Sequence, residues 1–188
     1  MRTIFMVMLL AQTASAQSVP EIRTAVTRAL PILQSSDSVF VSKRTCVSCH
    51  HNVLPIMTFH LARDRGFTVD PKVLSAVEDK TFRELRSANA LDNAIQATTL
   101  NDPTPDESYL FVAAHTAGLE PDLTTEVYAR RLVRWQRDGH WITSDFRPPH
   151  SSSLFTCTAT AVRAIRLYMP PALRAAGVDM PGSVGGLR

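Results

Sequence analysis

The stretch that decides the fold class is DPKVLSAVEDKTFREL, residues 70–85. Asp70 is a residue type that caps helix N-termini, and Pro71 suits the first helical turn, where its missing N–H costs no hydrogen bond. Apolar residues then recur at a spacing that collects them on one side of a helix, at Leu74, Val77, Phe82 and Leu85. The stretch therefore predicts an amphipathic helix with one buried face.

A second amphipathic helix is expected near the start of the chain. It begins at Ser18, and Glu21 three residues later completes the pattern of a capping box. Pro31 lies inside the helix and predicts a kink or two shorter helices, with residues 39–41 closing the segment. The apolar stripe of this helix consists of Ile22, Val26, Ala29, Leu30 and Leu33.

Caps and stop residues of the same kinds predict the remaining organisation. Gly66 stops one helix and Gly118 stops another. We expect helices over residues 53–65, 106–117, 121–136 and 151–168, a linker at 101–105, a turn at 138–139 and an extended break at 147–149. No segment alternates apolar and polar residues with the period of a strand, so the sequence predicts an all-α fold.

The overall composition is that of an ordinary globular protein. The chain has 188 residues, of which 45% are hydrophobic and 20% charged, and this excludes disordered, collagen-like and multi-span membrane proteins. The net charge of +3 is too small to indicate binding to nucleic acid. Three cysteines in a chain of this length are too few for a disulfide scaffold.

The N-terminus has the pattern of a secretory signal peptide. Met1 and Arg2 give a positive start, an apolar run extends to Ala11, and Ala14-Ser15-Ala16 places small residues where a signal peptidase cleaves. The apolar run is shorter than the roughly 20 residues needed to span a bilayer, so a stable membrane anchor is not expected. We predict cleavage after Ala16 and a periplasmic or otherwise exported protein, with an uncleaved N-terminal anchor as the alternative.

The chemistry of the chain is concentrated in Cys46-Val47-Ser48-Cys49-His50, which has the C-x-x-C-H pattern of c-type haem attachment. Each residue of a helix advances by about 100°, so Cys46, Cys49 and His50 would lie on one side of a single helical turn. The two thiols would form thioether bonds with one haem, and His50 would be an axial ligand of the iron. Export supports this interpretation, because thiols outside the cytoplasm otherwise become oxidised.

Two other interpretations of these residues are open. Cys46 and Cys49 would suit a redox-active disulfide, but that motif expects a βαβ setting, which is absent from the sequence pattern. A structural zinc ion is the other option, with Cys46, Cys49, His50 or His51, and His60 as its ligands. A second C-x-x-C or a spaced histidine pair would strengthen the zinc interpretation, and the sequence has neither.

Met57 is the leading candidate for the distal iron ligand. It follows His50 by seven residues, so it would reach the other face of the haem only if the chain turned at Pro55. Other candidates are Met169, His60, His115, His140 and His150. The remaining cysteine, Cys157, is expected on the buried side of a helix as a small apolar residue.

Residues 135–141, WQRDGHW, resemble the Q-x-x-G-x-W repeat of the squalene–hopene cyclase and prenyltransferase superfamily. The resemblance implies an α/α toroid, with Gln136 capping a helix and Trp141 stacking on a neighbouring repeat. Residues 46–171 also resemble exported bacterial proteins that join a C-x-x-C-H segment to cyclase-like helix pairs. The acidic D-x-D-D sequence of the cyclases is absent, Asp145 is isolated, and a full toroid needs more helices, so cyclisation is not expected.

Together these patterns predict four segments: a signal peptide (1–16), a helical segment with the haem site (17–66), a partial α/α toroid-like helical array (67–176) and a frayed tail (177–188). The function expected is single-electron transfer to a redox partner protein by one covalent haem c. The alternative is a haem-based sensor or binding module whose helical half takes a hydrophobic ligand. An enzyme ranks last, because no acid–base pair or nucleophile has a recognisable spacing.

Overall fold

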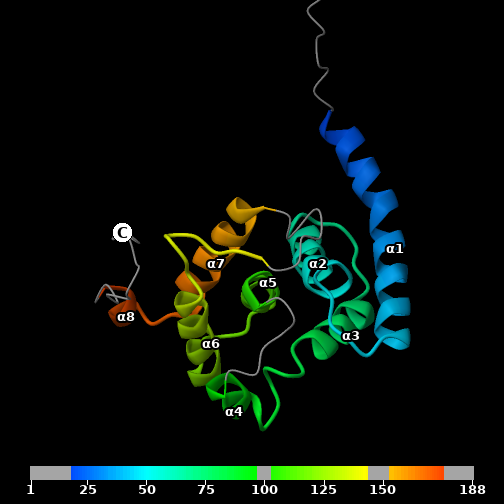
Figure 1. The fold of residues 1–188 in the computed structure, drawn as a ribbon. Helices are drawn as coiled ribbons and strands as arrows, with labels where there is room; N and C mark the ends of the chain where they lie inside the picture. Colours follow the sequence, from blue (N-terminus) through cyan, green and yellow to red (C-terminus); the bar gives the residue numbers. More distant parts are fainter. Residues whose placement is uncertain (1–17, 97–102, 144–152, 176–188) are drawn as a thin grey trace, which may run out of the picture.

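The computed structural model describes residues 18–96, 103–143 and 153–175, and these residues form an all-α fold (Figure 1). The predicted fold class is therefore confirmed. Arg137 and His140 form an isolated bridge, and the described residues contain no β-strand. The helices in chain order are α1 (Val19–Lys43), η1 (Cys49–Val53, a π-helix), α2 (Leu54–Asp64), α3 (Pro71–Thr81), α4 (Ala90–Ile95), α5 (Pro103–Thr116), α6 (Leu123–Arg134), α7 (Leu154–Tyr168) and α8 (Pro171–Ala175).

Most helix boundaries agree with the caps read from the sequence. Ser18 and Glu21 form the expected capping box on α1, and the Asp70 side chain accepts a hydrogen bond from the Lys72 amide at the start of α3. Asp122 caps α6 in the same way. Glycines in the left-handed region follow α2 and α5, as predicted, and release the chain from the helical path.

Several of the helices differ from the prediction by a few residues or more, or were not predicted at all. α1 runs unbroken through Pro31 to Lys43, because Pro31 is exposed and water can satisfy the carbonyl that loses its partner. α3 ends at Thr81 instead of residue 85, and the short helix α4 was not expected. α5 begins at Pro103, within the predicted linker, since a proline fits the first turn of a helix. The predictions for residues 1–16, 147–149 and 177–188 lie outside the described residues.

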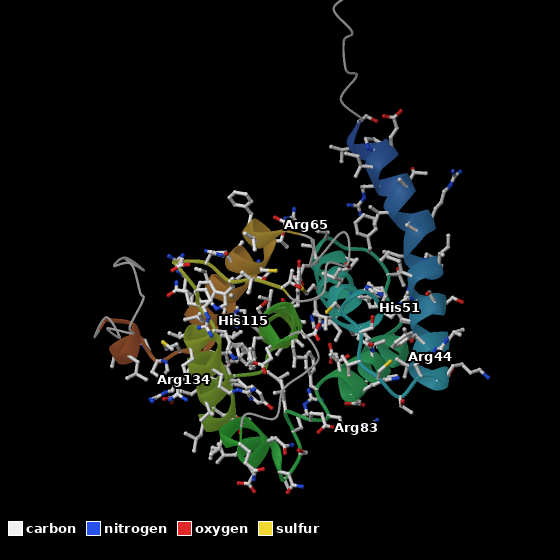
Figure 2. All side chains as sticks on the ribbon, in the orientation of Figure 1. Arg44, His51, Arg65, Arg83, His115 and Arg134 are labelled. Carbon is white, nitrogen blue, oxygen red and sulfur yellow. The ribbon has the colours of Figure 1, made fainter. Side chains whose placement is uncertain are left out.

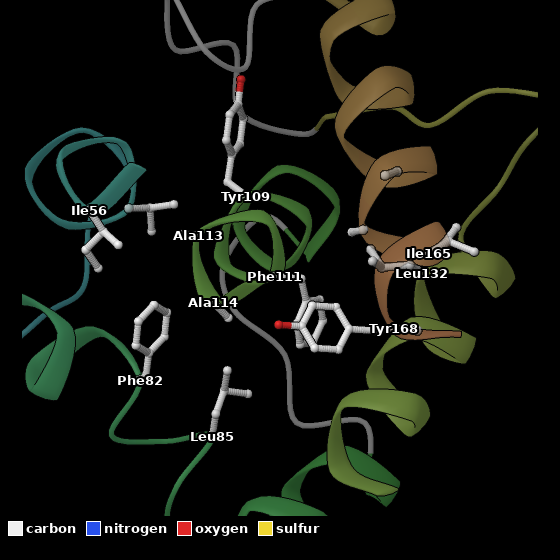
Figure 3. Packing of buried hydrophobic residues seen from close by; sticks show 14 of the residues in the cluster. Ile56, Phe82, Leu85, Tyr109, Phe111, Ala113, Ala114, Leu132, Ile165 and Tyr168 are labelled. Atoms are coloured by element: carbon white, nitrogen blue, oxygen red, sulfur yellow. The ribbon is translucent and has the colours of Figure 1, made fainter. Parts of the chain in front are cut away.

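The core is built around α5, which lies among α2, α6 and α7 (Figure 1). From Glu107 to Ala114 every residue except Leu110 is buried, as expected for a helix covered on all sides. Figure 3 shows Ile56 of α2 and Phe111 of α5 in one cluster with Leu132, Ile165 and Tyr168 from α6 and α7. The segment around the C-x-x-C-H sequence therefore shares its core with the C-terminal half.

Trp141 joins the end of α6 to α7. Its indole Nε1 donates a hydrogen bond to the Leu132 carbonyl at 2.6 Å, and its amide donates to Thr158 Oγ1 at 3.1 Å. The predicted turn at residues 138–139, where Asp138 and Gly139 have positive φ, reverses the chain so that Trp141 returns to the end of α6. Trp141 is thus a buried anchor between two helices of this chain, with 1% of its surface exposed.

α1 lies at the edge of the molecule, against α3 and η1 (Figure 1). Of its predicted apolar stripe, Leu30 is buried and Val26 is half-buried, in a small cluster with Phe59 and Leu74. The other three residues of the stripe, Ile22, Ala29 and Leu33, are exposed, so only part of the predicted apolar stripe is buried. Among the described helices, none has the length and apolar character that crossing a membrane requires.

Candidate haem attachment site

The C-x-x-C-H sequence straddles the start of a helix. Cys46 lies in a bend after α1, whereas Cys49 and His50 open the π-helix η1. Ser48 is the N-cap, and its amide donates to the Asn52 side chain at 2.9 Å. The expectation of a single α-helical turn through all three residues is therefore not met. Instead, the fully buried side chain of Asn52, one turn later in the chain, fixes the start of η1 through this hydrogen bond.

The three attachment residues differ in their surroundings. Cys46 and His50 are exposed, whereas Cys49 lies at the margin of the core with 9% of its surface exposed. The Cys49 thiol donates to Asp106 Oδ1 of α5 at 3.2 Å. None of the three cysteines is in a disulfide, so Cys46 and Cys49 are not joined in this structure.

Cys157 and Tyr109 extend the surroundings of Cys49 into the core. Burial raises the pKa of Tyr109, and the neighbouring thiols of Cys49 and Cys157 raise it further. Cys157 is fully buried on α7, as the sequence predicts. Tyr109 thus lies in a buried region to which the thiols of η1 and α7 contribute.

His51 anchors the motif to α1. Its ring stacks on Phe40 with centroids 4.6 Å apart, and the ring of His50 meets it edge-on at 5.1 Å. Figure 2 shows His51 at the side of α1. His51 Nδ1 is buried, and no hydrogen-bond partner for it is present among the described residues. The sequence pattern marks His51 only as an alternative zinc ligand, and its packing on Phe40 carries no sequence signal.

Lys80 fixes the chain just before Cys46. This nearly buried residue of α3 donates from Nζ to the carbonyls of Val41 at 3.3 Å and Arg44, at the C-terminus of α1. Its ammonium group also lies 5.1 Å from the centre of the Phe40 ring. A cation is favoured there because the last carbonyls of a helix lack backbone partners. Sequence reasoning missed this contact, since α3 and the end of α1 are far apart in the chain.

Met57 follows His50 on one continuous helical segment. η1 continues directly into α2, and the Leu54 amide donates to the Cys49 carbonyl. The chain therefore does not turn at Pro55, and Met57 is half-buried against the main core. The condition on which its role as iron ligand depended is not fulfilled, because the helix carries Met57 onward from His50 on the same segment.

The other distal candidates are dispersed. His60 is 2.7 Å from Glu78 through Nε2, Met169 is buried at the end of α7, and the exposed His115 meets the Tyr168 ring edge-on. His140 lies in the turn after α6, and His150 lies outside the described residues. In the described ranges no three side chains of the metal-binding types gather at one point.

A buried glutamate–arginine contact crosses the core next to Asp106. Glu107 Oε1 of α5 lies 3.4 Å from Arg131 Nη2 of α6, and both side chains are almost fully buried. Burial raises the pKa of Glu107 to about 8, although the positive charge of Arg131 opposes the rise. Arg131 also faces the Tyr128 and Trp135 rings. The pair joins α5 to α6, and no sequence signal identified it.

An open pocket of about 590 Å³ lies between the start of α6 and the end of α7. Its walls combine apolar residues such as Leu123 and Met169 with the carboxylates of Asp122 and Glu126. None of the residues that line it belongs to the C-x-x-C-H sequence or to η1. It is therefore a site separate from the candidate haem attachment residues.

Comparisons with known protein families, with curated proteins and with solved structures found no match for this chain. The resemblance of Gln136 and Trp141 to a cyclase repeat consequently stays a prediction.

Proposed function

We propose that this chain is an exported c-type haem protein that transfers single electrons, with one haem held by Cys46 and Cys49. The observation that carries the proposal is the C-x-x-C-H sequence at residues 46–50, whose two cysteines are not joined by a disulfide. The exposure of Cys46 and His50 supports it further, because a group as large as haem needs access to these side chains.

The residues present fit covalent attachment. Cys46 and Cys49 would hold the haem, each thiol adding across one vinyl group so that sulfur would bond one carbon and the thiol hydrogen the other. The His50 imidazole would supply a nitrogen ligand to the iron. A bound haem would supply the one-electron couple. The chain would set the position of the motif through His51 against Phe40 and through Lys80 at the end of α1.

The decisive experiment tests covalent attachment in a host that exports and matures c-type cytochromes. We expect the purified protein to carry the added mass of one haem, retained in a denaturing gel. Replacing Cys46→Ala together with Cys49→Ala removes it, whereas the matched control Cys157→Ala keeps it. Haem that stays covalently bound in the double variant, or a bare peptide mass in a host with working haem assembly, contradicts the proposal.

A second candidate function, haem-based sensing with a ligand-binding helical half, is favoured by the pocket between α6 and α7. The two functions differ in the sixth iron position. A six-coordinate spectrum that carbon monoxide does not change supports electron transfer, whereas fast carbon monoxide binding to the reduced form supports sensing.

A further inference from the structure

The outer face of α1 carries apolar side chains that no other part of the described chain covers. Ile32 is 70% exposed and Val39 57%, and Ala25 is exposed as well. The opposite side of the same helix packs on α3 through Leu30. Single exposed apolar residues are ordinary, but a row of them along one helix indicates a contact surface.

The row is arranged symmetrically about Ile32. Ala25 and Val39 lie seven residues before and after it, and Glu21 and Lys43 lie eleven residues before and after. Seven residues fall about 20° short of two helical turns, and eleven residues run about 20° past three turns. All five side chains therefore start from a band about 40° wide along α1. We call this band the α1 stripe.

We propose that the α1 stripe pairs with the α1 stripe of a second copy of this chain, antiparallel and with the two-fold axis at Ile32. Ala25 then lies opposite Val39 of the second copy, a small side chain against a larger one. Glu21 lies opposite Lys43 of the second copy at both ends, so that opposite charges meet. A two-fold pairing of this kind uses the same surface on both chains.

The charges select the antiparallel direction. A parallel pair in register would bring Glu21 against Glu21 and Lys43 against Lys43, which repel. Antiparallel packing also opposes the two helix dipoles. At the margin of the stripe Arg28 comes opposite Ser36 of the second copy, and its aliphatic stem can cover apolar surface while the guanidinium stays in water. The pairing is independent of haem attachment.

Sedimentation equilibrium of the full chain in reductant tests the pairing, since reductant prevents crosslinks through Cys46. We expect a concentration-dependent dimer and, for Ile32→Glu, a dissociation constant raised at least about tenfold. The matched control is Ile95→Glu, an isoleucine of α4 that is 64% exposed and should leave the dimer unchanged. Circular dichroism checks that both variants keep their helices.

Charge reversal tests the direction of the pair. Glu21→Lys alone and Lys43→Glu alone place like charges at both ends of the antiparallel dimer and should weaken it. An equimolar mixture of the two variants restores both attractions in the antiparallel dimer. The combined variant E21K/K43E restores them within one kind of chain, whereas a parallel dimer of this variant would still place like charges together. A monomer at all concentrations, a dimer that survives Ile32→Glu, or a combined variant no tighter than its single parents overturns the proposal. Membrane vesicles that capture a monomer through Ile32 overturn it as well.

Discussion

Asp37 makes the stability of this protein depend on pH in a direction opposite to that of most carboxylates. The residue lies on the buried side of α1 with 2% of its surface exposed, and its Oδ2 has no hydrogen-bond partner among the described residues. Burial raises the pKa of Asp37 from 3.8 to about 7. The folded protein therefore keeps a proton on this carboxyl that the unfolded chain has already released.

The sign and the size of the effect follow from that difference. Because the folded state binds more protons between pH 3.8 and about 7, the free energy of unfolding falls as pH rises through this range. Each pKa unit corresponds to about 1.4 kcal/mol, so the full effect is on the order of 4 kcal/mol as an upper bound. Asp37→Asn removes the charge with almost no change of shape and should abolish this part of the pH dependence.

The assay is urea unfolding of the full chain, followed by circular dichroism at pH 4.5 and pH 8. We expect Asp37→Asn to stabilise the protein by only about 1 kcal/mol at pH 4.5, and by about 2–4 kcal/mol at pH 8. Asp64→Asn, at an exposed position on α2, is the control and should show no such difference. A gain that is equal at both pH values, or a loss at pH 8, would refute the reasoning.

Three further predictions concern contacts around the core and the motif. Lys80→Met leaves the last carbonyls of α1 without their donor and should lower the free energy of unfolding by about 1–3 kcal/mol. Amide exchange over residues 40–50 should become faster, and unchanged exchange would show that the contact does not order this segment. Trp141→Phe removes the donor to the Leu132 carbonyl and should cost about 1–3 kcal/mol in urea unfolding, and a neutral result would contradict the anchoring role. Met57→Ala in the haem-loaded protein should lower stability while leaving any methionine–iron absorption band in place, and loss of the band would restore Met57 as the distal ligand.

The helices were predictable wherever a local signal marks their ends. Ser18 with Glu21, Asp70 with Pro71, and Gly118 act within a few residues of themselves, so the sequence alone locates these boundaries. α4 was missed because six residues are too few for a helical period to become visible. The break expected at Pro31 is absent because its cost depends on exposure, which only the packed structure reveals.

The residue types of the candidate site can be read from the sequence, whereas their surroundings cannot. The residue types and spacing of Cys46, Cys49 and His50 identify the motif without a structure. The contacts that hold it come from residues far away in the chain, Lys80 and Asp106, and local patterns carry no information about them. The π-helix at Cys49 was equally hidden, because it departs from the α-helical period assumed for the motif.

The shared core of η1, α2 and α5 bears on how this protein can be dissected. Val53 and Ile56 are buried in the same cluster as Phe111 and Tyr168, more than fifty residues away in sequence. A peptide cut before α5 would expose these side chains and lose the carboxylate that meets Cys49. The C-x-x-C-H segment is therefore unsuited to transplantation as a minimal module, because it carries apolar side chains that only α5 and α7 cover.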